Sequence, residues 1–221
     1  MTLANAHSLF LGLKPDISFK RAIHIDTGDD EDSMLRQADG EIRSAIRSAF
    51  RRVGTILDSD EGRRRRVSER AGEASSKSRR VLSLDVRFLR QGSFAYRTLI
   101  RPAQCPPQEL DLDDGVYVPV EFVGGVPIFP SAAFFFVIER ALEPLLRDHP
   151  DWELETKDTC IRISFKGKGA HIDLPLFAVD EDEFRRIEKN LNDASDGQAR
   201  IAKVLNEHRR HGLNEHYRVP P

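Results

Sequence analysis

Apolar side chains recur at helical spacing between residues 41 and 57. Positions three and four apart lie on one face of a helix, so this stripe predicts an amphipathic helix over residues 41–57. Its apolar face would consist of Ile42, Ala45, Ile46, Ala49, Phe50, Val53, Ile56 and Leu57. The acidic run at residues 29–32 before it indicates an exposed entry to a helix.

Residues 58–80 are rich in Arg, Glu, Ser and Gly and poor in large apolar side chains, which predicts an exposed polar loop. A strand-like run follows over residues 81–89, and residues 101–108 are typical of a loop. A second strand is predicted over residues 109–120, with a break at Asp114-Gly115.

The rest of the chain predicts a mixture of helices and short strands. Helices are expected over residues 131–146, 180–192 and 196–210, and strands over residues 152–157, 160–165 and 170–177. This order of elements is typical of an α+β fold, in which helices pack on one side of a mixed sheet.

Alternation along two of these strands places three aspartates on polar faces, because side chains two apart share a face. Asp111 and Asp113 lie opposite the leucines that flank them in sequence. Asp173 shares its face with His171, for which we expect a hydrogen-bonding rather than a catalytic role. Taken alone, the Asp111–Asp113 doublet is also compatible with exposed residues that share no site.

Three carboxylates held together would repel one another strongly. Each pair about 4 Å apart costs roughly 4 kcal/mol at an effective dielectric near 20, so three pairs cost on the order of 12 kcal/mol. This is comparable to the stability of a whole domain. A divalent cation would remove the repulsion, and oxygen-only ligands select Mg²⁺, with Mn²⁺ as the alternative, over zinc.

The end of the first strand carries a glycine and a hydroxyl, in Gln91-Gly92-Ser93. Backbone N–H groups at such a turn can approach a phosphate closely, because glycine lacks a Cβ atom. A Gly-Ser turn, an Asp-x-Asp pair and a later single strand aspartate together favour a site for a metal ion and a nucleoside triphosphate.

Three segments resemble the signature of polymerase β-type nucleotidyltransferases: residues 91–98, 109–115 and 171–176. In detail they are most similar to the bacterial cGAS/DncV-like nucleotidyltransferases, and residues 157–162 fit that comparison. The resemblance implies a catalytic core over residues 81–184, with the helical segment and polar loop of residues 1–80 packed on it. Residues 185–221 would begin a helical lobe, which we expect to be truncated because the chain stops at Pro221.

The resemblance also implies roles for individual residues. Two magnesium ions would be held by the three residues that also form the catalytic set, Asp111, Asp113 and Asp173. Nucleotide contacts are implied for Gln91, Gly92, Ser93, Tyr96 and Arg162. Since Asp173 would bind only the inner ion, it is the expected acceptor of the proton from the attacking hydroxyl.

The implied function is a second-messenger synthase that joins ATP and GTP into a cyclic purine dinucleotide of the cyclic GMP-AMP kind. In the family such enzymes act in bacterial antiphage signalling, which implies operon-encoded regulatory partners. A linear oligonucleotide or nucleotide-transfer enzyme is the alternative within the same chemistry. A non-catalytic nucleotide-binding fragment that keeps the fold is the alternative from another class.

Composition narrows these options. The 221 residues carry a formal net charge of −2, which argues against a protein that binds a long nucleic acid template. Cys105 and Cys160 form no metal or redox spacing, and no apolar run is long enough to span a bilayer. The residues after Met1 lack the features of a signal peptide, so we expect a cytoplasmic protein without membrane contact.

Overall fold

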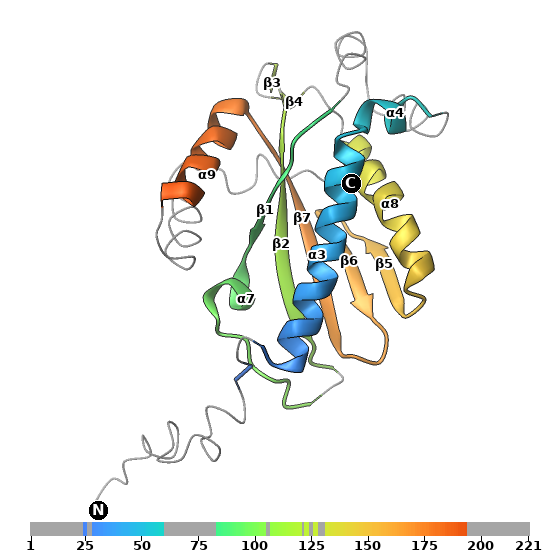
Figure 1. Ribbon diagram of the computed structural model, residues 1–221, viewed down its shortest axis with the longest axis vertical. Coiled ribbons are helices and arrows are strands. Elements are labelled where there is room, and N and C mark those ends of the chain that lie inside the picture. The colour runs from blue at the N-terminus through green and yellow to red at the C-terminus, as the bar shows by residue number, and fades with distance from the viewer. Residues whose placement is uncertain are drawn as a thin grey trace, which may run out of the picture.

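The computed structural model of the chain describes residues 24–25, 28–59, 83–104, 107–120, 122–123, 126–127 and 131–193. Its helices are α3 (Asp30–Phe50), α4 (Val53–Leu57), α7 (Gly92–Tyr96), α8 (Ser131–Asp148) and α9 (Glu181–Asp193). Its strands are β1 (Arg87–Arg90), β2 (Leu110–Pro119), β3 (Phe122–Val123), β4 (Val126–Pro127), β5 (Trp152–Thr156), β6 (Cys160–Phe165) and β7 (Ala170–Val179). Figure 1 shows a central sheet with α3 and α8 laid against it, and α9 beside its β1 edge. The expected α+β class is therefore confirmed, but the helices do not all pack on one side of the sheet as predicted, because α9 lies on the face opposite α3 and α8.

The main sheet has the strand order β1-β2-β7-β6-β5. β2 and β7 run parallel to each other, and the other neighbouring pairs are antiparallel, so the sheet is mixed as expected. The short strands β3 and β4 pair only with each other within the described part of the chain. The parallel pair lies inside the sheet, with a neighbouring strand on each side.

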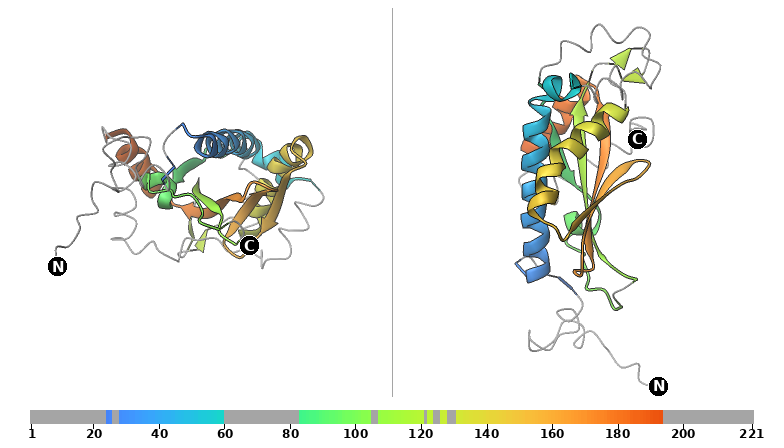
Figure 2. Two further views of the ribbon diagram at one scale, coloured as in Figure 1. Left: turned by 90° about the horizontal axis from the view of Figure 1, so that it is seen from below. Right: turned by 90° about the vertical axis from the view of Figure 1, so that its right-hand side faces the viewer.

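Alternation along β2 and β7 separates a buried face from a second face. The even-numbered apolar residues of both strands belong to the main core, together with the inner sides of α3 and α8. These two helices lie on the same side of the sheet (Figure 2), and the rings of Phe50 and Phe134 stack between them. On the other face, odd-numbered Tyr117 and Val179 pack with Phe184 of α9. The polar odd-numbered positions lie nearer the start of β2 and β7.

The bounds of the first helix differ from those predicted. Instead of one helix over residues 41–57, α3 begins at Asp30 and ends at Phe50, and α4 follows separately. The first turn of α3 carries Asp30, Glu31 and Asp32, and negative charge at a helix N-terminus is favourable. The helix ends because the backbone leaves helical values at Arg52, where φ is −119°.

Strand β1 is shorter than the predicted strand over residues 81–89 and starts only at Arg87. The N–H of Leu84 donates to the carbonyl of Phe50 at 2.9 Å. This hydrogen bond ties the preceding segment to the end of α3 and not to the sheet. Residues 81–82 lie outside the described residues.

The predicted break at Asp114-Gly115 is wrong, because β2 runs without interruption from Leu110 to Pro119. Asp114 points into the helix layer, is completely buried and accepts hydrogen bonds of 2.7 and 2.6 Å from Arg43. A Cβ at Gly115 would lie 2.7 Å from the Gln91 amide nitrogen and 2.9 Å from the Tyr117 ring. Asp114 and Gly115, which suggested a turn, are therefore explained by tertiary contacts: Asp114 pairs with Arg43, and Gly115 leaves room for the side chains of Gln91 and Tyr117.

The remaining elements agree with prediction to within two residues at either end for α8, β5, β6, β7 and α9. The predicted polar loop from residue 60 onward and the helix over residues 196–210 lie outside the described residues. No helix in the described ranges has the length and apolar character needed to cross a membrane.

Replacing Phe50 by Ala tests the contact between α3 and α8. Phe50 is completely buried, and its ring centroid lies 6.3 Å from that of Phe134. Urea denaturation should show a loss of about 3–5 kcal/mol in the free energy of unfolding. Ile100→Ala is the control, since Ile100 is 58% exposed, and should cost less than about 0.5 kcal/mol. Equal losses in the two variants would contradict this assignment of the core.

Candidate metal and nucleotide site

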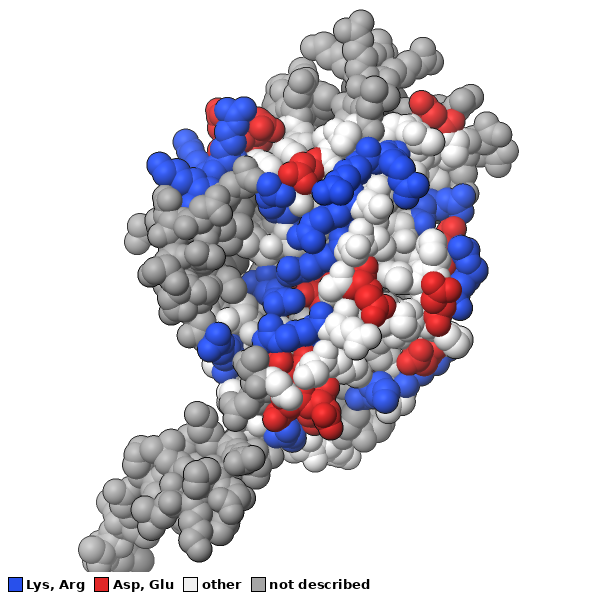
Figure 3. All heavy atoms as spheres, in the orientation of Figure 1, with Lys and Arg blue, Asp and Glu red and all other residues white. Residues whose placement is uncertain are grey.

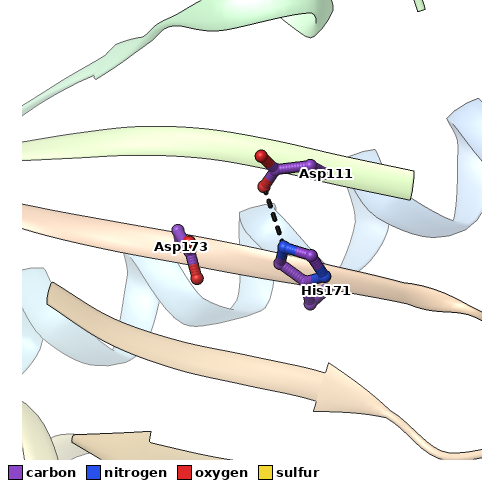
Figure 4. A group of neighbouring side chains, drawn as sticks. All are labelled: Asp111, His171 and Asp173. Atoms are coloured by element: carbon purple, nitrogen blue, oxygen red, sulfur yellow. Dashed lines mark ion pairs between the residues drawn. The ribbon is translucent and has the colours of Figure 1, made fainter. Parts of the chain in front are cut away.

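The parallel register of β2 and β7 brings the predicted aspartates together. Asp111 pairs with His171, and Asp113 pairs with Asp173. All four are odd-numbered and point away from the layer of α3 and α8. Figure 4 shows Asp111 projecting from β2 on the same side of the sheet as His171 and Asp173 from β7. One ligand atom from each of these three residues lies within 4.8 Å of the other two.

Asp173 is held by Arg162, its cross-strand partner on β6. The Nε and Nη2 atoms of Arg162 donate to the two carboxylate oxygens, each at 2.7 Å. Burial acts to raise the pKa of Asp173, but the hydrogen bonds and charge of Arg162 outweigh it and leave that pKa lowered. Asp173 is therefore ionised at neutral pH.

His171 lies between two carboxylates. Its Nδ1 is 2.8 Å from Oε2 of Glu109, and its Nε2 is 3.1 Å from Oδ1 of Asp111. The contact with Asp111 raises the pKa of His171 most; burial opposes this, and Glu109 adds to the rise. His171 thus lies between the carboxylates of Glu109 and Asp111, which agrees with the hydrogen-bonding role expected for it.

Asp113 carries the repulsion that remains. Burial, followed by the charges of Asp111 and Asp173, raises the pKa of Asp113 to about 6. Asp111 has the basic neighbour His171 and Asp173 has the basic neighbour Arg162, whereas Asp113 forms no ion pair with any of the described residues. The mutual repulsion predicted for the three aspartates is thus partly offset by Arg162 and His171 and is concentrated on Asp113.

The turn that begins α7 packs directly against Asp113. Gly92 has a φ of +61°, and a Cβ added there would lie 2.7 Å from Oδ2 of Asp113. The backbone N–H of Gln91 donates to the carbonyl of Asp113 at 2.8 Å. The side-chain amide of Gln91 donates to the hydroxyl of buried Tyr117 at 3.2 Å, so it supports the turn from behind.

The other residues implied in nucleotide binding lie on or near this turn. Ser93 is the second residue of α7, and its carbonyl accepts a hydrogen bond from the N–H of Thr98 at 2.9 Å. Tyr96 ends α7 and is 43% exposed. The structure therefore joins Asp111, Asp113 and Asp173 with the Gly92 turn and Arg162. Nucleotide contacts of all these residues stay predictions.

Residues behind the site were missed in the sequence. Asp39 and Arg43 of α3 and Arg90 of β1 form a buried charge network with Asp114 of β2. Burial acts to raise the pKa of Asp114, and the hydrogen bonds and charge of Arg43 oppose that shift. A signal was present, since Asp114 occupies a core-facing position in an otherwise apolar alternation.

These residues fit a divalent cation bound through oxygen. Both nitrogens of His171 lie against carboxylates, which leaves the oxygens of the aspartates as the ligands. The missing Cβ of Gly92 keeps the space beside Asp113 open. Carboxylate oxygens are the ligands preferred by Mg²⁺ and Mn²⁺.

Comparison with protein families gives a match over residues 86–177 to the nucleotidyltransferase domain described as "Cyclic GMP-AMP synthase DncV-like". The chain is 39% identical over 105 residues to a cyclic GMP-AMP synthase of Vibrio cholerae, an alignment that covers 48% of this chain and 24% of the relative. It is 36% identical over 104 residues to a cyclic GMP-AMP synthase of Escherichia coli, covering 47% of this chain and 24% of that relative.

Solved structures of the V. cholerae dinucleotide cyclase are also similar. A mutant in complex with ATP, GTP and 5MTHFGLU2 superposes with a TM-score of 0.66 and 26% identity, over 85% of this chain and 54% of that one. A complex with the linear intermediate 5′ pppA(3′,5′)pG gives a TM-score of 0.58 and 27% identity, over 80% of this chain and 50% of that one. The matched part thus spans about a quarter of the curated relatives and about half of the solved chains.

Gly92→Ala should disrupt the site beyond the cost of its backbone strain. Both Gly92 and Gly167 have positive φ, but a Cβ at Gly167 would meet no atom within 4 Å. Each Ala variant should lose about 1–2 kcal/mol of stability. Only Gly92→Ala should also weaken Mn²⁺ binding, measured by electron paramagnetic resonance, because its Cβ pushes on Asp113. Equal Mn²⁺ affinity in the two variants would contradict the close packing.

The pKa shifts predict opposite effects for two of the aspartates. The pKa of Asp113 rises from 3.8 to about 6 on folding, so the folded state binds more protons between these values and stability falls as pH rises through them. Asp113→Asn should therefore melt higher than wild type at about pH 7.5, and the two should converge near about pH 4.

Asp173→Asn should behave in the opposite way, since the lowered pKa of Asp173 contributes stability above its ordinary value of 3.8. This variant should melt lower than wild type at about pH 7.5, because Arg162 loses its partner. Thermal melting in the presence of a chelator measures both effects. A shift in the same direction for both variants would exclude the proposed division of charge.

Proposed function

We propose that the aspartate site of this chain, whose residues 86–177 match a DncV-like nucleotidyltransferase domain, joins ATP and GTP into a cyclic purine dinucleotide. One observation carries this proposal: the Gly92 turn packs on Asp113, which faces Asp173 across the β2–β7 pair. This contact supports the proposal that a phosphate-binding turn and metal-binding carboxylates act together. Relatives described as cyclic GMP-AMP synthases support the choice of product.

Each part of the site has a proposed task. Asp111, Asp113 and Asp173 hold two magnesium ions, which when bound activate the 3′-hydroxyl and neutralise charge on the departing pyrophosphate. The turn formed by Gln91, Gly92 and Ser93 holds the donor triphosphate through its backbone. Tyr96 lies on the acceptor side.

Arg162 and Asp173 act in sequence in this proposal. Both oxygens of Asp173 accept hydrogen bonds from Arg162, which makes this carboxylate a poor proton acceptor. A triphosphate competes for the same guanidinium, since phosphate oxygens also accept its paired N–H groups. When Arg162 turns to the nucleotide, Asp173 regains basicity and accepts the proton of the attacking hydroxyl.

A cyclic product requires two transfers, because one set of three aspartates activates one hydroxyl at a time. After the first transfer, the linear intermediate must turn around so that its remaining triphosphate becomes the donor at Ser93. A relative of this chain is described in complex with such a linear intermediate, which supports the two-step route. A cytoplasmic role in bacterial antiphage signalling, with operon-encoded regulatory partners and without a nucleic acid template, completes the proposal.

Incubating the chain with ATP, GTP and Mg²⁺ tests the reaction. We expect a cyclic purine dinucleotide by mass spectrometry and two pyrophosphates released per product. Asp111→Asn, Asp113→Asn and Asp173→Asn should each slow transfer by about 1,000-fold or more, because the loss of a ligand removes several kcal/mol of charge stabilisation. Asp148→Asn, which changes an exposed carboxylate at the end of α8, is the matched control.

The outcomes separate the alternatives. Near-normal turnover in the Asp113 or Asp173 variant would contradict the metal-dependent mechanism. Linear products alone would exclude the cyclase and keep a linear nucleotidyltransferase. Absence of any transfer, with triphosphate binding that still depends on the three aspartates, would favour the nucleotide-binding fragment.

A further inference from the structure

Four charged residues form a network directly behind the candidate site. Asp39 and Arg43 belong to α3, Arg90 to β1 and Asp114 to β2. The side chains of Asp39 and Asp114 are completely buried, whereas those of Arg43 and Arg90 retain 19% and 26% exposure. We call these four residues the quartet.

The contacts of the quartet run continuously from one strand to the other. Arg43 donates to both oxygens of Asp114 at 2.7 and 2.6 Å, and its Nε also lies 3.2 Å from Oδ1 of Asp39. Arg90 donates to Oδ2 of Asp39 through Nε at 2.9 Å and through Nη2 at 2.5 Å. Arg90 and Asp114 are themselves cross-strand partners in the β1–β2 pair. Helix α3 thus clamps both strands at one level.

The quartet lies at the same position along β1 and β2 as the candidate site. Asp114 directly follows Asp113, and Arg90 precedes Gly92 by two residues. Successive side chains of a strand point to opposite faces, so β2 presents Asp113 to the site and Asp114 to the quartet. The turn lies directly beside this carboxylate, since a Cβ at Gly92 would come within 2.7 Å of Oδ2 of Asp113.

Further basic side chains lie around the quartet. Figure 3 shows Lys and Arg gathered along the seam between α3 and β1, and Arg43 and Arg87 both lie near Arg47. Buried ion pairs contribute little net stability compared with apolar packing, but bidentate pairs restrict geometry.

We infer that the quartet is a positioning device that sets the distance between the Gly92 turn and the carboxylates of β2. The inference rests on the proposed function, in which the turn and the metal-binding aspartates grip one triphosphate together. Its four members are positioning residues, since they act through the backbone of β1 and β2. Their loss should uncouple metal binding from triphosphate binding while leaving each separate half of the site formed.

The test measures how strongly Mn²⁺ tightens the binding of a non-hydrolysable ATP analogue, by calorimetric titration of the full chain with and without the metal. Coupled ligands typically change each other's affinity by about 5–150-fold, and we expect about tenfold or more for wild type. In Asp114→Asn and Arg90→Lys this ratio should fall by about fivefold or more. The affinity for Mn²⁺ alone, from electron paramagnetic resonance, should change by less than about twofold.

A double variant separates positioning from mere stability. Asp114→Asn leaves Arg43 with one buried partner fewer, whereas Arg43→Gln with Asp114→Asn removes both charges and should regain melting temperature. We expect the coupling ratio to stay low in this double variant. Recovery of the ratio together with the melting temperature would overturn the inference and leave the quartet a structural role.

Glu41→Gln is the control, because it breaks a different contact of α3, the 2.9 Å pair with His149. Its coupling ratio should equal that of wild type. If wild type couples the two ligands and the quartet variants couple them equally well, only the present inference fails. If wild type shows no effect of Mn²⁺ on binding of the analogue, the proposed function fails and the inference falls with it.

Discussion

Compensation of negative charge along β2 is the constraint on which the rest of the structure depends. Asp111, Asp113 and Asp114 lie within four residues of one strand that is largely buried. A buried charge without a partner costs several kcal/mol. Asp114 and Asp111 have partners on other elements, whereas Asp113 has no ion pair among the described residues. Arg43 of α3 pairs with Asp114, and His171 of β7 contacts Asp111. Placing these partners fixes both the helix layer and the neighbouring strand.

Two of the site carboxylates are left in contrasting states. Asp173 is ionised and fully occupied by Arg162, whereas the charge on Asp113 is opposed by burial and by its neighbours. The protein thus stores its electrostatic strain on the residue nearest to the Gly92 turn. In the proposed function, a cation would relieve the charge on Asp113, and a triphosphate would pair with Arg162. Both contacts would favour the same bound arrangement.

Much of this could be predicted from sequence because it depends on local periodicity. The period of two along β2 and β7 identified Asp111, Asp113 and Asp173, and most elements were bounded to within two residues. Asp114 was misread as a strand break because its partner, Arg43, is 71 residues away. The early start of α3 and the grip of Arg162 on Asp173 likewise depend on charges and pairings that no short window contains. Ion pairs between residues that are distant in sequence could not be predicted from hydrophobic periodicity.

The parallel pairing of β2 with β7 has a consequence for how the molecule assembles. Parallel strands cannot be joined by a tight turn, and here β3 to β6 and α8 lie between them in the chain. Strands β5, β6 and β7 form an antiparallel meander of mostly local contacts, and β1 with β2 forms a separate antiparallel pair. Asp113 meets Asp173 only where these two halves dock. A nascent or half-folded chain therefore lacks the assembled site, and under the proposed function binding of a cation or nucleotide would report that docking is complete.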